Sequence, residues 1–282
     1  MYRKINQVLT ARPASDGAGV KLNRVFGGGR STKDFDPFLL LDEFGSDEAC
    51  DYIAGFPSHP HRGFETVTYM LNGKMLHEDH LGSKGLLNGG DVQWMTAARG
   101  IIHSEMPQQE EGLMRGFQLW VNLPSKEKMK DPFYRDIPAS DIPETNFNGI
   151  KVKVIAGDLN LNGEDLKGAV NGLSTEPLYL DVHLPENSEI EIPVTDGHTA
   201  LAYVYENEIY AGDSATVLKA LDVGLFSREG MIKVTNKAAA RFLVLAGKPI
   251  GEPVAQYGPF VMNTTQEIEQ AIQDYRNGVL TS

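Results

Sequence analysis

The sequence predicts an all-β protein made of two antiparallel β-barrels in tandem, followed by a short C-terminal helix. Three observations support this prediction: short apolar runs alternate with turn residues along most of the chain, the two halves resemble each other, and helical periodicity is confined to the tail. At 282 residues, the chain is long enough for two domains that each bury a core of their own.

The predicted strands are runs of four to eight residues bounded by Gly, Pro, Asn and Asp. The chain contains 29 Gly and 15 Pro, as expected for a protein with many tight turns. This pattern is typical of a β-sandwich or a barrel. The clearest strands are expected at 38–41, 65–71, 92–95, 117–123, 151–156, 178–184, 200–205 and 242–246.

A stretch rich in Lys, Asp and Pro, residues 125–149, has weak periodicity and is predicted to connect the two domains. The expected domains are therefore 1–135, an N-terminal barrel, and 136–282, a C-terminal barrel that ends in the helix.

The two sides of this connection resemble each other. Residues 64–75 can be aligned with 198–209, and 117–124 with 242–249. Because the two matches occur in the same order, they indicate a duplicated barrel.

The predicted helix covers residues 265–277. Its apolar positions recur at helical spacing, a threonine precedes it as a cap, and Gly278 ends it. These apolar positions are Ile268, Ala271, Ile272 and Tyr275.

Composition excludes several classes of protein. The chain has 26 Lys and Arg against 38 Asp and Glu, a formal net charge of -12, which disfavours direct binding to nucleic acid. No apolar run is long enough to span a membrane, so we expect a cytoplasmic protein without membrane contact. Cys50 is the single cysteine, which excludes an internal disulfide and a thiolate zinc site. A metal site must therefore use nitrogen and oxygen ligands.

Two short motifs supply such ligands. His59 and His61 are two residues apart, and His103 and Glu105 have the same spacing. Side chains two apart on a strand point to the same face, so two neighbouring strands could offer three imidazoles and a carboxylate to one ion. This set suits Fe(II), Mn(II), Ni(II), Cu(II) or Zn(II). No comparable pair occurs in the second half of the chain, so we expect one mononuclear site, in the first barrel.

Other polar residues near these motifs are assigned lesser roles. Glu65 competes with Glu105 as the carboxylate ligand, and we favour Glu105, with Glu65 beside the site. Arg62 and Arg99 lie next to the ligand pairs in sequence and are expected to orient ligands or attract an anionic substrate, or else to form structural salt bridges. His77 follows a turn amid charged residues and is expected at a solvated strand end.

Several stretches resemble the signature of the pirin family, including the two metal motifs. The family resemblance extends over almost the whole chain. The stretches are GFPSHPHRGFET at 55–66, GDVQWMTA at 90–97, RGIIHSEMP at 99–107, LWVNLP at 119–124 and GPFVMNT at 258–264. The resemblance implies two cupin (jelly-roll) barrels, a bicupin, with Fe(II) in the first on His59, His61, His103 and Glu105.

The resemblance also implies two alternative functions. One is a quercetin 2,3-dioxygenase, in which a phenolic substrate and O2 meet at the metal, Glu105 or Glu65 takes the phenol proton, and the ring opens. The other is an iron-dependent regulatory protein that acts by binding a protein partner, without a dedicated small-molecule substrate.

Overall fold

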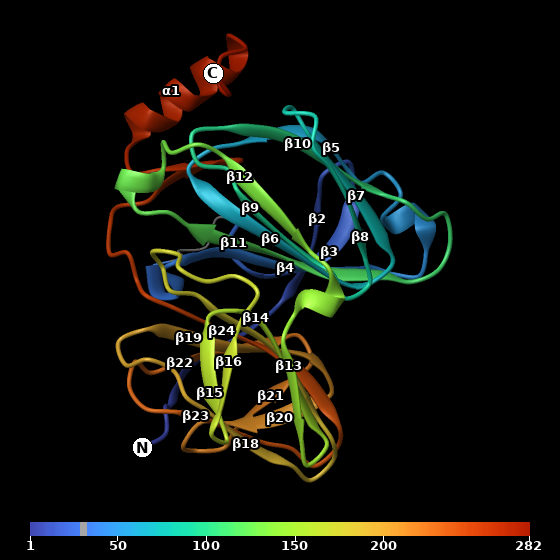
Figure 1. Cartoon of the computed structure of the whole chain (residues 1–282), viewed down its shortest axis with the longest axis vertical. Helices are drawn as coiled ribbons and strands as arrows, with labels where there is room; N and C mark the ends of the chain where they lie inside the picture. The colour runs from blue at the N-terminus through green and yellow to red at the C-terminus, as the bar shows by residue number, and fades with distance from the viewer. Residues whose placement is uncertain (29–32) are drawn as a thin grey trace. The chain divides into compact units, whose positions relative to one another are not determined.

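The computed structural model describes residues 1–28 and 33–282, and its chain divides into two compact units. We call residues 13–28, Phe38–Ala139 and Ile250–Ser282 the histidine unit, and Met1–Arg12, 33–37 and Ser140–Pro249 the second unit. Nearly all regular structure in both units is β-strand (Figure 1), and all pairings between strands are antiparallel in the part described. This confirms the predicted all-β fold.

The histidine unit contains a seven-stranded and a four-stranded sheet. The order of the larger sheet is β12 (Phe133–Ile137), β9 (Val92–Thr96), β6 (Phe64–Asn72), β11 (Met114–Asn122), β4 (Phe38–Ser46), β3 (Val20–Phe26) and β2 (Arg12–Asp16). The order of the smaller sheet is β5 (Phe56–His61), β10 (Ile101–Pro107), β7 (Lys74–Asp79) and β8 (Lys84–Asn88).

The second unit repeats this arrangement. Its larger sheet has the order β1 (Ile5–Thr10), β22 (Asp222–Phe226), β19 (Thr199–Glu206), β24 (Ala240–Gly247), β17 (Leu178–Leu184), β14 (Ile150–Ala156) and β13 (Glu144–Phe147). Its smaller sheet has the order β18 (Glu189–Ile192), β23 (Ile232–Thr235), β20 (Glu208–Ala211) and β21 (Thr216–Lys219), and β15 (Asp158–Leu161) pairs with β16 (Glu164–Lys167). Each unit is thus a cupin-like pair of sheets rather than a barrel closed by continuous hydrogen bonding.

The matching strand orders confirm the predicted duplication. Strands β6 and β19 hold the third place in their sheets, as the alignment of 64–75 with 198–209 requires. The first strands of the two larger sheets differ in origin, however. The position of β12 in the histidine unit is taken in the second unit by β1, which comes from the N-terminus of the chain and pairs with β22.

The compact units therefore differ at both termini from the expected ranges 1–135 and 136–282. Residues Met1–Arg12 belong to the second unit, because β1 completes its larger sheet. The C-terminal helix belongs to the histidine unit, because its buried face packs there. The division of the chain into domains 1–135 and 136–282 stays a prediction.

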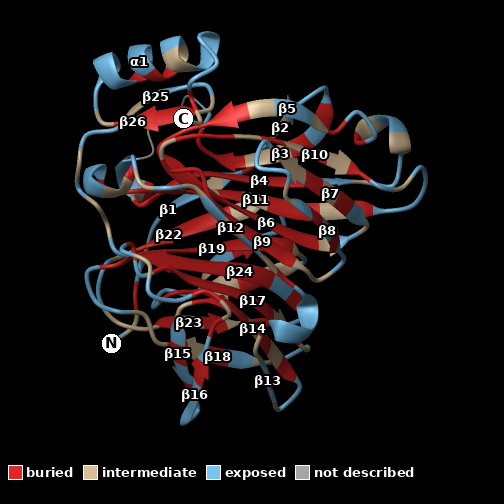
Figure 2. Ribbon diagram, turned by 45° about the horizontal axis from the view of Figure 1, so that its top comes forward, coloured by how far each residue is buried: buried red, intermediate tan, exposed pale blue. Residues whose placement is uncertain are grey.

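Apolar side chains facing the interior of each unit form its core (Figure 2). In the second unit, the buried cluster takes alternate residues from both sheets, as expected for half-buried strands. Members of this cluster include Val152, Leu180, Ile192, Val204, Ile232, Val234 and Phe242.

The helix α1 (Thr265–Arg276) confirms the sequence prediction, and it follows the hairpin of β25 (Ala255–Tyr257) and β26 (Phe260–Met262). Thr264 and Glu267 form a capping box, in which each side chain binds the backbone N–H of the other residue. Ile268 and Ala271 are buried, whereas the outward face is exposed (Figure 2). No helix in the described part of the chain is long and apolar enough to span a membrane.

Gly63 is a point where two backbones nearly touch. Its φ is +93°, and a Cβ added there would lie 1.9 Å from the carbonyl oxygen of Val261. We expect Gly63→Ala to lower the free energy of unfolding by about 3 kcal/mol, from left-handed strain plus overpacking. Thermal unfolding of the metal-free protein measures this. Gly82→Ala is the matched control, because Gly82 has φ +81° with no atom within 4 Å of such a Cβ. Equal melting temperatures for the two variants would contradict the close contact.

Candidate metal centre

Two paired strands bring the predicted histidines together. Strand β5 carries His59 and His61, β10 carries His103, and the ladder places His103 opposite His59. Residues two apart on β5 point to one face, so both rings are directed toward the ring from β10. The His-x-His spacing therefore brings three imidazoles into one cluster once β5 and β10 pair.

The three rings are close enough to share one ion. One nitrogen from each of His59, His61 and His103 lies within 4.8 Å of the others, and they form the only such group of three potential ligands in the described residues. The His59 Nε2 and His61 Nε2 atoms are 3.0 Å apart. Ring centroids are separated by 4.7 Å, 4.3 Å and 4.9 Å.

The hydrogen bonds of these rings fit a metal. His59 Nδ1 lies 2.8 Å from the Pro57 carbonyl oxygen, which can only accept, so Nδ1 carries the proton and Nε2 presents its lone pair. His103 Nε2 is buried without a hydrogen-bond partner. A buried, unpartnered imidazole nitrogen is costly unless it binds something, so this donor set suits a divalent ion.

Burial keeps two of the rings neutral. His61 and His103 are almost fully buried, and burial holds the pKa of each imidazole well below its usual value of 6.5. Electrostatic interaction with a neighbouring ring lowers each pKa further: with His59 for His61, and with His61 for His103. Neutral imidazole is the form that ligates metals. Burial therefore favours the ligating form of His61 and His103.

The two candidate carboxylates lie in different surroundings. Glu105 is outside the group of three histidines; its Oε1 accepts from the Thr68 hydroxyl at 2.9 Å, and Gln118 Nε2 lies 3.4 Å from its Oε2. Glu65 accepts from the Thr96 hydroxyl at 2.6 Å, and burial raises its pKa. The choice of Glu105 as the fourth ligand stays a prediction.

The expectation for His77 was wrong. This residue is fully buried rather than solvated, and the centroid of its ring lies 4.9 Å from that of His103 on β10 and 5.6 Å from that of Tyr134 on β12. Its Nδ1 lies 3.3 Å from Nδ1 of His103, behind the candidate ligand. The turn and charged neighbours of His77 gave no sign of this, whereas its alternation with Met75 along the strand could have indicated it.

The two arginines take part in different contacts. Arg62 is buried and pairs with Asp274 on α1, whereas Arg99 pairs with Asp131 near the surface. Both therefore form ion pairs, which was the alternative expected from the sequence. Whether either one also acts on ligands or substrate stays a prediction.

In the second unit, aliphatic side chains occupy the positions of the ligands. In the second unit, Ile192 on β18 pairs with Ile232 on β23, just as His59 on β5 pairs with His103 on β10 in the histidine unit. The two strand ladders therefore match His59 with Ile192 and His103 with Ile232. By the same registers, His61 corresponds to Val194 and Glu105 to Val234. In the sequence alignment, His59 and His61 fall opposite Pro193 and Thr195, and His103 and Glu105 fall near Lys233 and Thr235. Each of these positions is one residue later than the one given by the strand registers. A metal at the positions given by the registers would have no ligands.

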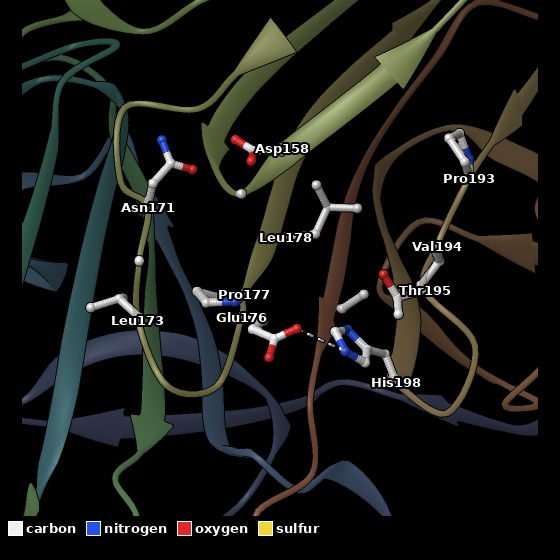
Figure 3. A pocket seen from close by; sticks show the side chains of 13 residues that line it. Asp158, Asn171, Leu173, Glu176, Pro177, Leu178, Pro193, Val194, Thr195 and His198 are labelled. Atoms are coloured by element: carbon white, nitrogen blue, oxygen red, sulfur yellow. Dashed lines mark ion pairs between the residues drawn. The ribbon is translucent and has the colours of Figure 1, made fainter. Parts of the chain in front are cut away.

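The second unit nevertheless has a pocket, of about 320 Å³ (Figure 3). Asp158, Asn171, Glu176, Thr195 and His198 contribute its polar side chains. The imidazole of His198 lies 3.6 Å from Glu176 Oε2. These side chains do not form a cluster of three ligand atoms, so the pocket does not resemble the histidine centre.

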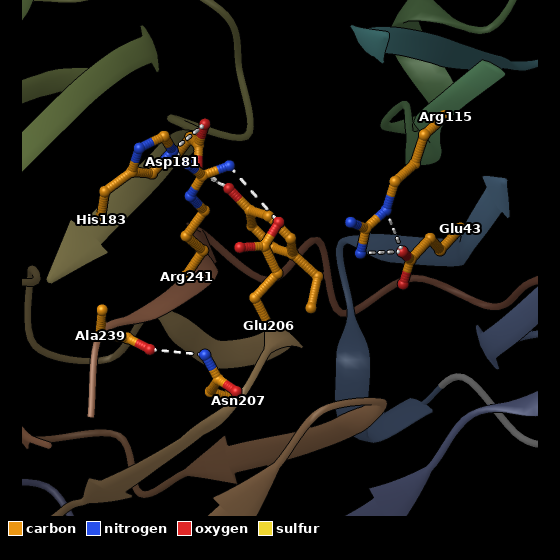
Figure 4. A network of polar contacts seen from close by, with 9 residues as sticks. Glu43, Arg115, Asp181, His183, Glu206, Asn207, Ala239 and Arg241 are labelled. Atoms are coloured by element: carbon orange, nitrogen blue, oxygen red, sulfur yellow. Dashed lines mark hydrogen bonds and ion pairs between the residues drawn. The ribbon is translucent and has the colours of Figure 1, made fainter. Parts of the chain in front are cut away.

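The other histidine of this unit has a structural role (Figure 4). His183 Nε2 lies 3.1 Å from Asp181 Oδ2, and the Tyr205 hydroxyl donates to the same carboxylate at 2.6 Å. The same figure shows, in the histidine unit, the ion pair of Arg115 with Glu43 at 2.7 Å. The contact of Tyr205 with Asp181 joins β19 to β17 across β24, and the pair of Arg115 with Glu43 joins the neighbouring strands β11 and β4.

Comparison with family models assigns both halves of the chain. The model described as Pirin matches residues 19–121, and the model described as Pirin C-terminal cupin domain matches 179–281. A Pseudomonas aeruginosa protein named "Putative quercetin 2,3-dioxygenase" is 55% identical over 281 residues, 99% of this chain and 98% of the relative. Human pirin is 41% identical and covers 98% of this chain and 93% of its own length.

Solved structures agree with the fold. A quercetin 2,3-dioxygenase from Acinetobacter baumannii aligns with a TM-score of 0.91 and 36% identity, over 100% of this chain and 99% of its own. A bacterial pirin from Escherichia coli in complex with nickel(II) aligns with a TM-score of 0.62 and 18% identity, over 88% of this chain and 98% of its own. The second likeness supports the fold alone.

Proposed function

Because this chain belongs to the pirin family, we propose that it is an Fe(II)-dependent dioxygenase that opens the ring of a flavonol such as quercetin. The observation that carries the proposal is the group of three imidazoles, His59, His61 and His103, in a chain 55% identical to a relative with a quercetin 2,3-dioxygenase name. Other divalent first-row metals suit the same ligands, so iron rests on the family resemblance.

In this proposal, the chain holds the ion with His59 Nε2, His61 Nε2 and His103 Nε2, and Glu105 completes the set. When bound, the ion would supply Lewis acidity for the reaction of the phenol with O2. Thr68 and Gln118 orient the Glu105 carboxylate. The raised pKa of Glu65 suits an acceptor for the phenol proton, since a base works best when its pKa approaches the operating pH.

The test is O2 uptake by iron-loaded protein over a library of phenols. We expect uptake that requires both a phenol and the metal, and loss of it in His59→Ala, because that variant lacks one imidazole of the cluster. An oxygen electrode measures the uptake, and metal analysis of each sample shows whether the site is loaded. Loaded protein that consumes no O2 with any flavonol in the library would contradict the proposal.

The alternative is an iron-dependent regulator that binds another protein. It is favoured by the second unit, whose fold is complete but whose ligand positions hold Ile192, Val194, Ile232 and Val234. In the same experiment, this alternative predicts no phenol-dependent uptake, together with metal-dependent capture of one defined partner. A cytoplasmic location is expected for both functions.

A further inference from the structure

The C-terminal segment, residues 258–282, contacts both strands that carry the candidate ligands. Phe260, Ile268 and Leu280 form a buried cluster against which Ile102, the neighbour of His103 on β10, is packed. A Cβ added to Gly100, just before β10, would lie 2.3 Å from the carbonyl oxygen of Leu280. The last residues of the chain therefore lie directly on the start of β10.

Arg62 connects this segment to β5. Arg62 directly follows His61, and its side chain is only 5% exposed. Its Nη1 lies 2.6 Å from Asp274 Oδ2 on α1, and its Nη2 donates to the Leu280 carbonyl at 2.9 Å. Its Nε donates to the carbonyl of Arg99, at the approach to β10. One guanidinium thus joins the end of β5, the beginning of β10 and the C-terminal helix.

Hydrogen bonds also hold the backbone beside Arg62 to the C-terminal segment. The N–H of Val261 donates to the Arg62 carbonyl at 3.0 Å. The buried ammonium of Lys128 donates to the Gly63 carbonyl at 2.7 Å and to the Val261 carbonyl at 3.1 Å. The turn after His61 therefore has little room to move independently of residues 258–282.

We propose that Arg62 is a positioning residue for the metal centre, and that its ion pair with Asp274 uses the C-terminal helix to hold His61 and His103 in register for one ion. The inference rests on the metal site of the proposed function. A ligand set binds tightly when its side chains are held in place before the ion arrives. Removing one partner of a buried ion pair leaves the other charge uncompensated. We therefore expect the contact between Arg62 and α1 to loosen when Asp274 loses its charge.

The test compares two variants of the full chain that each remove one negative charge from α1. Asp274→Asn removes the partner of Arg62, whereas Glu269→Gln changes an exposed residue whose side chain makes no hydrogen bond or ion pair with the described residues. Arg62→Lys provides a second variant, because lysine keeps the charge but lacks the planar fork of donors. Each protein is loaded with Co(II), whose visible spectrum reports the geometry of its ligands.

We expect Asp274→Asn and Arg62→Lys to release Co(II) to a chelator about tenfold faster than wild type, at the lower end of the effects of residues that orient ligands. Their Co(II) spectra should change, and in the metal-free protein amides of 56–63 and 100–107 should exchange hydrogen faster. Glu269→Gln should match wild type in all three measurements.

Equal release and equal exchange in Asp274→Asn and Glu269→Gln would overturn the positioning role while leaving the metal site intact. Wild-type protein that binds Co(II) but, loaded with iron, oxidises no phenol contradicts the proposed function alone. Wild-type protein that binds no Co(II) contradicts both.

Discussion

Replacing His103 by alanine is expected to weaken metal binding more than about 100-fold, since even residues that only orient ligands contribute 10- to 100-fold. His103 supplies the ring from β10, and the remaining pair, His59 and His61, both come from β5. Two imidazoles from one strand leave one side of the ion without a protein nitrogen. Metal analysis after dialysis against a weak chelator measures the loss.

The variant should stay folded, because each unit has a core of its own and the centre contributes few of its side chains. Circular dichroism of the metal-free protein checks this. His80→Ala is the matched control, because His80 is exposed and lies outside the group of three histidines. Full metal occupancy in His103→Ala, or equal loss in His80→Ala, would contradict the assignment of the site.

The features that could be predicted from the sequence are those that depend on local pattern. Alternating apolar residues and turns indicated the strands, the capping threonine and Ile268 with Ala271 indicated the helix, and the His-x-His spacing indicated two rings on one face. A family resemblance then implied that the two motifs hold one ion in the first barrel. These signals are contained in short windows, so they require no knowledge of the tertiary structure.

The features that could not be predicted depend on contacts between distant segments. Nothing local in Met1–Arg12 shows that β1 completes the sheet of the second unit, and nothing in α1 shows that Asp274 meets Arg62. His77 was misjudged for the same reason, since its buried ring lies beside those of His103 and Tyr134, which are distant in the sequence. The one-residue shift between the sequence alignment and the strand ladders of the second unit similarly became visible only through strand register.

Replacing each candidate carboxylate by glutamine is expected to identify the fourth ligand. Glutamine keeps the shape of glutamate but removes the charge, so it weakens a bond to a divalent ion while it can still accept a hydrogen bond. If Glu105 is the ligand, we expect Glu105→Gln to lower metal affinity at least tenfold and to abolish phenol-dependent O2 uptake. Metal titration and O2 uptake measure the two effects separately.

Glu65→Gln should behave differently, because burial holds the pKa of Glu65 above its usual value and the Thr96 hydroxyl bonds its carboxyl group. A group that is readily protonated is a weak ligand but a suitable proton acceptor. We therefore expect Glu65→Gln to keep its metal and to lose turnover, by about 100-fold if it serves as the general base. Full occupancy and activity in Glu105→Gln, with loss of both in Glu65→Gln, would reverse the assignment and make Glu65 the ligand.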